Sequence, residues 1–397
     1  MENTQKTIAC IAQAGARNPV FAFRPAALKQ AARVFLDQFE GQVLYAVKTN
    51  PEPHVTDALV QCGVRSFDVA SLEEVRRIHE RYPEARLFFM HPVKARHAIR
   101  EAYFEYGVRN FSLDTPEELQ KILEETDGAK DLGLHLRITI PNTYAELNLS
   151  EKFGVNLQEA PKLLRKMREV AQELGVCFHV GSQCMHPDAY RIAMRMVAKM
   201  VKQSKVKLDY FNVGGGFPSV YPGMIPPPLT DYFDAIHEEF RKVEGWRDMT
   251  LLSEPGRAIV AESTSVIVRV ELRKGNTLYI NDGAYGCLFD AGTPKFIFPV
   301  RLLRSDAPDT SDMVPYSFYG PTCDSLDFMK GPFYLPKDVK EGDYIEIGQI
   351  GAYGRTLATG FNGFFHEEGV VEVSDAPLMS MYADEPFTHD PMEVVAA

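Results

Sequence analysis

Eight short apolar runs recur along the first two thirds of the chain, and amphipathic segments separate them. The runs cover residues 44–47, 66–69, 86–91, 109–113, 133–140, 176–181, 208–213 and 250–254. Between the runs, apolar residues recur at helical spacing, as at Tyr190, Met194, Val197 and Val201. Strands that alternate with helices pair in parallel and are buried on both faces. Eight such units in roughly 240 residues predict an α/β fold, a TIM-like (β/α)8 barrel, with an open doubly wound sheet as the alternative.

Two of the predicted helices begin with residues typical of helix N-termini. Ser71 is followed by Glu74, and Thr115 is followed by Pro116 and Glu118. In a capping box the hydroxyl accepts a hydrogen bond from the first turn and the glutamate reciprocates, and proline suits the first helical position. We therefore predict capping boxes at both helix starts.

The pattern changes after residue 262. Runs at 265–272 and 277–282 alternate or are β-branched, and Arg-Lys-Gly-Asn at 273–276 joins them as a hairpin signal. Further strands are expected at 344–347 and 370–373. We predict a barrel domain over residues 24–262 and a C-terminal β-domain over residues 263–397, joined by a strand from residues 1–23.

Composition narrows the function. The chain has 397 residues, enough for two domains, and 45% of them are hydrophobic. A net charge of −11 argues against nucleic-acid binding. The six cysteines have neither C-x-x-C nor zinc-ligand spacing, and we see neither a signal peptide nor an apolar run long enough for a bilayer. We expect a cytoplasmic protein with no bound metal and no membrane partner.

Polar residues gather where the predicted barrel strands end. Barrel enzymes carry their catalytic groups on that face, and the residues found there are Lys48, Asp68, Arg137, His179 and Glu254. A lysine amine can form a Schiff base with an aldehyde, and a carboxylate can hold a proton on a pyridine nitrogen. Each residue alone also has a structural reading, such as a solvated lysine, a core histidine, or an ion pair between Glu254 and Arg257.

Three successive glycines, Gly214, Gly215 and Gly216, follow the seventh predicted strand. Glycines let backbone N–H groups approach an anion closely, and barrels often bind phosphate with the loops after strands seven and eight. Arg257 follows the eighth strand. The pairing with this arginine favours a phosphate site over a flexible turn.

Seven segments resemble the fold-type III pyridoxal-phosphate-dependent decarboxylases, a family that includes ornithine, lysine, diaminopimelate, arginine and carboxynorspermidine decarboxylases. In the barrel the segments are YAVKTN at 45–50, FHVGS at 178–182, VGGGF at 213–217 and SEPGR at 253–257. In the β-domain they are YGPTCDSLD at 319–327, GAY at 351–353 and FNGF at 361–364. The resemblance implies an alanine racemase-like barrel with a β-domain, and it is nearest to the ornithine decarboxylase branch.

The resemblance also implies residue roles. Lys48 would hold pyridoxal 5′-phosphate, His179 would stack on the ring, and Glu254 would meet the ring nitrogen. The phosphate would be bound by Ser182, Gly214, Gly215, Gly216, Arg257 and Tyr353, and the ring environment would be oriented by Asp68, Glu74 and Arg137. Cys323 would return a proton to the substrate carbon. Cys323 and Asp324 would come from the partner subunit, so the active enzyme would be a homodimer.

The same motifs bear on the substrate. Cys323 is followed by Asp324, as in the ornithine and lysine branch, whereas diaminopimelate decarboxylases resemble Cys-Glu-Ser. Asp324 suits a distal ammonium, and the other substrate-site residues expected are Tyr285, Asp290 and Phe361. The loop that carries Asp290 is shorter than in ornithine decarboxylases, and one methylene is discriminated by only ~1–3 kcal/mol.

We therefore expect decarboxylation of ornithine, lysine or both, giving putrescine or cadaverine. The alternatives are a decarboxylase of diaminopimelate, carboxynorspermidine or arginine, and a non-catalytic regulatory relative. A racemase is disfavoured, because Asn50 is followed by Pro-Glu-Pro at 51–53.

Overall fold

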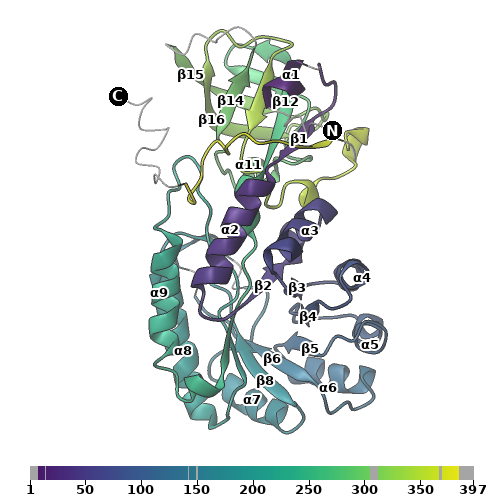
Figure 1. The fold of residues 1–397 in the computed structure, drawn as a ribbon, viewed down its shortest axis with the longest axis vertical. Helices are drawn as coiled ribbons and strands as arrows, with labels where there is room; N and C mark the ends of the chain where they lie inside the picture. The colour runs from purple at the N-terminus through teal and green to yellow at the C-terminus, as the bar shows by residue number, and fades with distance from the viewer. Residues whose placement is uncertain are drawn as a thin grey trace.

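The protein consists of a barrel and a β-sheet domain stacked along its long axis (Figure 1). The computed structural model describes residues 8–13, 15–141, 143–148, 151–304, 312–365 and 369–383. The chain runs from a short helix, α1 (Ile8–Gln13), through one strand of the sheet into the barrel, and then returns to the sheet. The described chain thus begins with α1 packed on the sheet, and near its other end Tyr382 packs on the barrel and donates to the carbonyl oxygen of Ala258.

Eight parallel strands close the barrel in the order β10-β11-β2-β3-β4-β5-β6-β8. They are β2 (Gln42–Ala46), β3 (Ser66–Val69), β4 (Arg86–Phe89), β5 (Asn110–Leu113), β6 (Gly133–Arg137), β8 (Glu173–Cys177), β10 (Tyr210–Asn212) and β11 (Thr250–Ser253). Every predicted strand is present, and the predicted barrel is confirmed over the open sheet. The longer predicted runs extended too far, because their last residues belong to the loops above the barrel.

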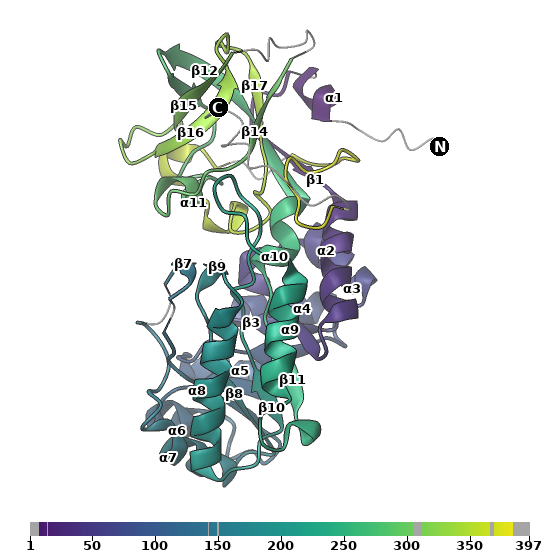
Figure 2. The same ribbon diagram turned by 90° about the vertical axis from the view of Figure 1, so that its left-hand side faces the viewer.

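Helices surround the barrel (Figures 1 and 2). They are α2 (Pro25–Gln38), α3 (Pro53–Cys62), α4 (Leu72–Arg81), α5 (Arg96–Phe104), α6 (Pro116–Glu125), α7 (Ala160–Arg168), α8 (Asp188–Ser204) and α9 (Leu229–Phe240). Aromatic side chains fill the space between them, and the Phe35 ring meets those of Phe217 and Phe233 edge-to-face at 5.2 Å each. Within the described ranges, no helix combines the length and apolar character that a bilayer span requires.

The predicted capping boxes are half right. Ser71 Oγ and Thr115 Oγ1 accept hydrogen bonds from the backbone N–H groups of Glu74 and Glu118, at 3.2 and 3.1 Å. The glutamates do not reciprocate. Glu74 accepts from the N–H one residue before the serine, at 2.7 Å, and Glu118 accepts from the N–H of Lys94 at 3.1 Å. The two glutamate carboxylates therefore bind other backbone N–H groups in place of those of their capping residues.

The β-domain is a single sheet of mostly antiparallel strands, in the order β14-β17-β12-β13-β15-β16. Its strands are β12 (Thr264–Lys274), β13 (Thr277–Ile280), β14 (Val300–Leu303), β15 (Met313–Tyr319), β16 (Phe328–Pro336), β17 (Tyr344–Ile347) and β18 (Val370–Glu372). The strand β1 (Val20–Phe23) pairs antiparallel with β12 and parallel with β18. The N-terminal segment is therefore an integral part of this sheet.

A buried arginine joins the two parts. Arg24, between β1 and α2, donates hydrogen bonds to Glu346 Oε1 at 2.5 Å, to Ser265 Oγ at 2.8 Å and to the carbonyl of Asp375 at 2.9 Å. A buried charge persists only when it is paired. This network holds the entry into the barrel against β12 and β17 of the sheet.

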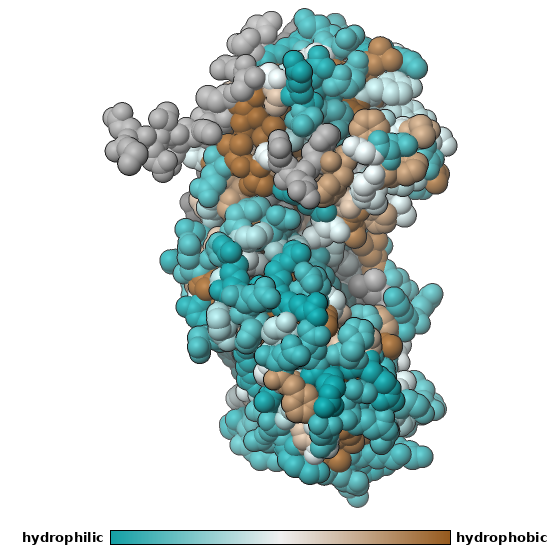
Figure 3. Space-filling model, turned by 90° about the vertical axis from the view of Figure 1, so that its right-hand side faces the viewer, coloured by the Kyte–Doolittle hydropathy of each residue, from teal (hydrophilic) through white to brown (hydrophobic). Residues whose placement is uncertain are grey.

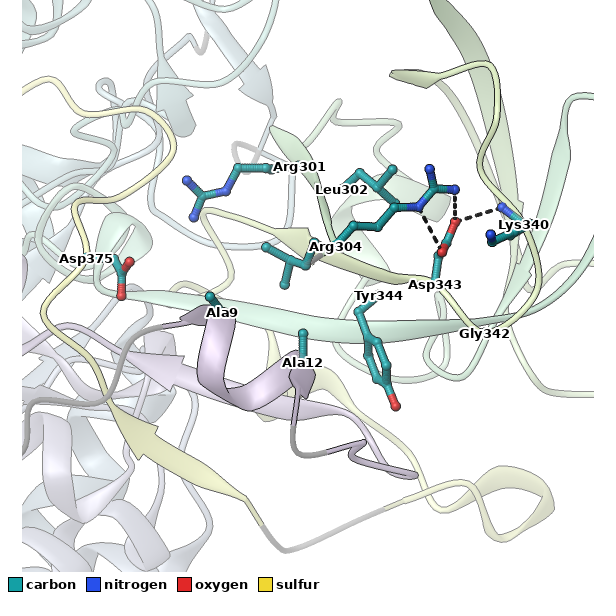
Figure 4. Close-up of a pocket in the computed structure, with 11 residues that line it drawn as sticks. Ala9, Ala12, Arg301, Leu302, Arg304, Lys340, Gly342, Asp343, Tyr344 and Asp375 are labelled. Carbon is teal, nitrogen blue, oxygen red and sulfur yellow. Dashed lines mark hydrogen bonds and ion pairs between the residues drawn. The ribbon is translucent and has the colours of Figure 1, made fainter. Parts of the chain in front are cut away.

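A pocket of the β-domain lies beside α1, β14 and β17 (Figure 4) and has a volume of about 530 Å³. Arg301, Arg304, Lys340, Asp343 and Asp375 line it. Arg304 is ion-paired with Asp343 at 2.6 Å, and Arg301 is ion-paired with Glu346, also at 2.6 Å. The predicted site residues lie elsewhere, in the loops that follow the barrel strands and in the β-domain segments opposite them.

Candidate active site at the barrel mouth

The lysine at the end of the first barrel strand is held by a buried carboxylate. Lys48 lies in the 3-10 turn Val47–Thr49 directly after β2, and its Nζ donates to Asp68 Oδ2 at 3.0 Å. Burial pushes the pKa of Lys48 down, but nearby acidic groups, with Asp68 the strongest, outweigh burial and raise that pKa above its ordinary value. The pairing fixes the position of the amine at the mouth of the barrel.

Three neighbouring strands turn polar residues toward the barrel axis. Arg137, Cys177 and Asn212 lie opposite one another in register on β6, β8 and β10. Cys177 packs in the cluster inside the barrel with Phe88 and Leu252, and residues opposite one another in a sheet share a face. Arg137 and Asn212 therefore point to the interior at the carboxyl ends of their strands.

Glu254 follows β11 and is almost fully buried. Burial, and then the Asp68 carboxylate, raise its pKa to about 7, while the Lys48 and Arg137 cations pull it down. Its Oε1 accepts a hydrogen bond from Asn212 Nδ2 at 2.7 Å. Because Lys48, Asp68 and Arg137 all act on the pKa of Glu254, the four side chains lie close together, as the strand-end pattern predicts.

His179 is uncharged at neutral pH. Burial, and then the cations of Arg137 and Lys48, place its pKa well below the ordinary value. Its Nδ1 accepts a hydrogen bond from the backbone N–H of Gly181 at 3.0 Å, which assigns the ring proton to Nε2. A neutral imidazole offers a flat face on which an aromatic ring can stack.

The glycine loop is pressed against the neighbouring strand ends. A Cβ on Gly214 would lie 2.0 Å from the carbonyl oxygen of Phe178, and one on Gly216 would lie 2.4 Å from that of Gly181. Both glycines have positive φ, at +70° and +104°. A Cβ on Gly215 would meet the carbonyl oxygen of Glu254 at 2.6 Å and His179 Nε2 at 3.1 Å. Only glycine lets the loop lie between these residues.

Arg257 opens the short helix α10 (Arg257–Val260) and is buried. Its Nη1 donates to Tyr221 OH and to Asp290 Oδ2, each at 2.9 Å. Its guanidinium carbon lies 4.9 Å from the ring centroid of Tyr353, so two residues predicted to bind phosphate are neighbours. Among the described contacts, the carboxylate partner of Arg257 is Asp290, so the ion pair with Glu254 that was the alternative prediction is not formed.

The structure gives Asp290 a partner that differs from the expected substrate ammonium. Its carboxylate, in α11 (Phe289–Gly292), is buried against Arg257.

Ser182 lies on β9 (Ser182–Cys184), opposite Leu147 of β7 (Ala145–Leu147). This small two-stranded sheet lies at the end of the barrel that faces the β-domain (Figure 2). Burial, and to a lesser degree Asp68, raise the pKa of Glu74 at the start of α4.

A second cluster forms entirely within the β-domain. Tyr285 OH donates to Asp324 Oδ2 at 2.6 Å, and the Tyr285 and Phe361 rings are 5.1 Å apart. The backbone N–H of Cys323 donates to Asn362 Oδ1 at 3.1 Å, and its thiol is exposed. The N–H of the residue two after Asp324, together with Tyr285, lowers the pKa of Asp324. The residues predicted as the acid and as substrate contacts, Cys323, Asp324, Tyr285 and Phe361, thus lie in one cluster.

The chain is similar to known proteins in both its barrel and its β-domain. The model of the pyridoxal binding domain of pyridoxal-dependent decarboxylases matches residues 26–261. This chain belongs to that family. The lysine/ornithine decarboxylase of Selenomonas ruminantium is 30% identical over 331 residues, covering 81% of each sequence. The family, the carboxy-lyase class and the pyridoxal phosphate cofactor predicted from the sequence are confirmed.

Two solved structures resemble this decarboxylase over nearly its whole length. A crystal structure of an SrLDC mutant in complex with PLP has a TM-score of 0.82 at 25% identity, covering 94% of this chain and 96% of that one. The lysine/ornithine decarboxylase of Vibrio vulnificus complexed with putrescine has a TM-score of 0.77 at 26% identity, covering 92% and 98%. The similarity therefore includes the β-domain as well as the barrel.

The residues at the barrel mouth of the decarboxylase fit the chemistry of pyridoxal phosphate. An amine meets the aldehyde, a neutral imidazole offers a stacking face, and a buried carboxylate suits a protonated ring nitrogen. A Cβ on any of the three glycines of the loop would collide with a neighbouring carbonyl oxygen. The buried Arg257 Nε has no hydrogen-bond partner among the described residues. The donor set matches the aldehyde, ring and phosphate of the cofactor.

Sequence reasoning missed two residues of the decarboxylase site. Asn212 joins Glu254 to the glycine loop, and Tyr221 hydrogen-bonds Arg257. The two-residue period along the seventh strand, which puts Asn212 on the same face as Tyr210, is a signal that could have found the asparagine. Tyr221 lies in a proline-rich loop, where no such periodicity exists.

Proposed function

We propose that this decarboxylase acts on L-ornithine, L-lysine or both, releasing carbon dioxide and leaving putrescine or cadaverine. The observation that carries the proposal is the ionised Asp324 beside Cys323, held by Tyr285. A carboxylate at this place suits a distal ammonium through a charge-assisted hydrogen bond. The lysine/ornithine decarboxylases among its relatives support the same reading.

In the proposed site, Lys48 binds the cofactor and Asp68 orients the lysine amine. When bound, pyridoxal phosphate supplies an electron-withdrawing ring that stabilises the negative charge left on the substrate carbon. Glu254 would keep the ring nitrogen protonated, and His179 would pack on the ring face. The remaining roles are phosphate binding by Ser182, Gly214, Gly215, Gly216, Arg257 and Tyr353, and support of the lysine and ring by Glu74 and Arg137.

The thiol of Cys323 is proposed to deliver a proton to the substrate carbon after carbon dioxide leaves. Asp324, Tyr285 and Phe361 then surround the distal end of the substrate. Asp290 is assigned differently from the sequence expectation. Its buried pairing with Arg257 supports a role in holding that arginine.

We further propose a homodimer, in which Cys323 and Asp324 of one subunit complete the site around Lys48 of the other. The contacts of the Cys323 cluster are all within its own β-domain. Leu326 beside it is 74% exposed, and Phe361, Phe364 and Phe365 are exposed as well. One face of the β-domain is visibly more hydrophobic than the barrel below it (Figure 3). Exposed apolar clusters of this kind mark protein interfaces.

We also propose a division into domains and a location in the cell. Residues 24–262 form the cofactor-binding domain and residues 263–397 form the β-domain, joined by residues 1–23; the family match over residues 26–261 supports this division. The protein works in the cytoplasm, where thiols stay reduced. Free thiols at Cys62, Cys177, Cys184, Cys287 and Cys323 support that location.

The test is carbon dioxide release from ornithine, lysine, arginine, diaminopimelate and carboxynorspermidine, with pyridoxal phosphate present. Release from ornithine or lysine is expected, and Lys48→Ala should abolish it. Lys207→Ala is the matched control, because this lysine is exposed, pairs with Asp248 and precedes β10, at the opposite end of that strand from the glycine loop. Release from diaminopimelate alone would contradict the role given to Asp324. Full activity of Lys48→Ala would contradict the mechanism.

The shared site is tested by mixing two inactive variants. Lys48→Ala and Cys323→Ala subunits, dissociated and reassociated, should form hybrid dimers in which one of the two sites is intact. About a quarter of wild-type activity should return if subunits pair at random through a two-fold interface. No recovery, with hybrid dimers demonstrated by mass, would refute the sharing. Leu326→Asp should weaken the dimer in sedimentation experiments.

A further inference from the structure

One buried amide connects the two halves of the cofactor site. Asn212, the last residue of β10, is fully buried. Its Nδ2 donates to Glu254 Oε1 at 2.7 Å, and its Oδ1 accepts from the backbone N–H of Gly214 at 2.8 Å. One end of the side chain therefore binds the carboxylate proposed for the ring nitrogen. The other end binds the first glycine of the loop proposed for the phosphate.

The direction of the first hydrogen bond matters chemically. An amide NH2 group only donates, so it binds the carboxylate form of Glu254 more strongly than the protonated acid, whose carbonyl oxygen is the weaker acceptor. Groups on several elements face Glu254. Asp68 on β3 and burial favour the acid, whereas Lys48 after β2 and Arg137 on β6 favour the carboxylate. Because the opposing effects leave the pKa of Glu254 at about 7, the loss of one donor changes its charge under working conditions.

The second hydrogen bond fixes where the amide can lie. Gly214 has φ +70°, and a Cβ there would collide with the carbonyl oxygen of Phe178, so the backbone lies in close contact with β8 and its loop. The N–H of Gly214 then orients the Asn212 side chain with its NH2 group toward β11. The N–H of Glu254 in turn donates to the carbonyl oxygen of Gly214 at 2.8 Å. The asparagine, the glycine and the glutamate thus form a closed set of three hydrogen bonds.

We propose that Asn212 is a positioning residue that keeps Glu254 as a carboxylate and couples it to the glycine loop. The coupling to cofactor binding rests on the proposed role of Glu254 at the ring nitrogen, whereas the coupling between Asn212 and Glu254 does not. Leucine at this position removes the donor at similar volume. Aspartate keeps an acceptor for Gly214 but sets a second carboxylate against Glu254, so that one of the two must hold a proton.

The experiment measures the ionisation of Glu254 directly in the full-length, cofactor-free protein. Carboxylate infrared bands are recorded from pH 5 to 9, and Glu254→Gln identifies the band of this residue. Asn212→Leu should move the midpoint of that band upward by about one pH unit, a tenfold change in the proton equilibrium. The matched control is Asn110→Leu, a buried asparagine on β5 that contacts His135 at 3.2 Å and not Glu254.

A second readout follows pyridoxal phosphate itself. Its dissociation constant is measured by absorbance across the same pH range, and the pH at which affinity declines should move with the Glu254 midpoint in Asn212→Leu. A uniform loss of affinity at every pH, with the Glu254 midpoint unchanged, would overturn the proposal. An equal shift of the midpoint in Asn110→Leu would also overturn it.

A shifted Glu254 midpoint with unshifted pyridoxal phosphate binding would uphold the role of Asn212 and refute the role proposed for Glu254. If Asn212→Leu fails to fold, Asn212→Asp provides the test, because it retains the acceptor for Gly214. That variant should show one proton shared between the two carboxylates, with a midpoint above that of the wild type. Two carboxylates ionised at neutral pH would overturn the proposal.

Discussion

The ion pair between Arg257 and Asp290 allows a quantitative test of how the barrel and the β-domain are joined. It connects α10 of the barrel to α11 of the β-domain over 2.9 Å, with only 3% and 7% of the two side chains exposed. Asp290→Ala leaves the guanidinium buried with Tyr221 as its remaining hydrogen-bond partner. Removing one partner of a buried pair typically costs ~3–5 kcal/mol. Because Tyr221 stays, we expect the lower end, about 3 kcal/mol.

The expected change in melting temperature follows from the size of the chain. At about 2.1 cal/mol/K of unfolding entropy per residue, a chain of 397 residues loses roughly 4 °C for about 3 kcal/mol. Thermal unfolding by circular dichroism, at fixed pH and without cofactor, measures this shift. The control is Asp248→Ala, whose ion pair with Lys207 has side chains 71% and 63% exposed for the lysine and the aspartate. Asp248→Ala should lower the free energy of unfolding by less than about 1 kcal/mol.

A double variant separates charge burial from packing. Arg257→Met alone leaves Asp290 buried and unpaired, so it should also destabilise strongly. Combined with Asp290→Ala, it removes both charges, and apolar replacement of a buried pair is often nearly neutral. The double variant should therefore be more stable than the sum of the single effects predicts. Simple additivity, or a shift in Asp290→Ala no larger than in the control, would refute the reasoning.

Three further predictions concern single residues. Burial and a nearby arginine lower the pKa of His135 inside the barrel to about 3, so the unfolded chain takes up the proton first. The contribution of the neutral His135 to the free energy of unfolding is complete above about pH 6.5 and is lost as the pH falls toward 3, by ~1.4 kcal/mol per pH unit. Urea unfolding of His135→Gln should lack this dependence of stability on pH. An unchanged dependence would assign it to other groups. Gly216→Ala should weaken pyridoxal phosphate binding at least tenfold in a titration, whereas Gly223→Ala, also at positive φ but with no atom within 4 Å of the added Cβ, should not. Thr115→Ala removes the cap of α6 and should lower the free energy of unfolding by ~1 kcal/mol; equal stability would mean that water replaces the cap.

The architecture was accessible from the sequence, and so was the position of several polar residues at the barrel mouth. Burial of a parallel strand on both faces imposes a local run of apolar residues, and the run at 66–69 coincides with β3 (Ser66–Val69). Glycines at 214–216 signal a loop in close contact, because any Cβ there would clash. Residues at strand ends share one face of a barrel, so Lys48 and Asp68 could be expected to meet. Such features depend on local geometry or on the symmetry of the barrel.

Only the tertiary structure decided which partner each polar group has. Asp290 is ion-paired with Arg257, Glu118 accepts from the backbone N–H of Lys94 where a capping box was expected, and Asn212 donates to Glu254. The physical reason is that a carboxylate carries no local signal of its partner. Its hydrogen bonds and its pKa depend on distance and burial, and both are set by segments that are remote in the sequence. The chain encodes which groups can ionise, and the packed barrel determines which of them do.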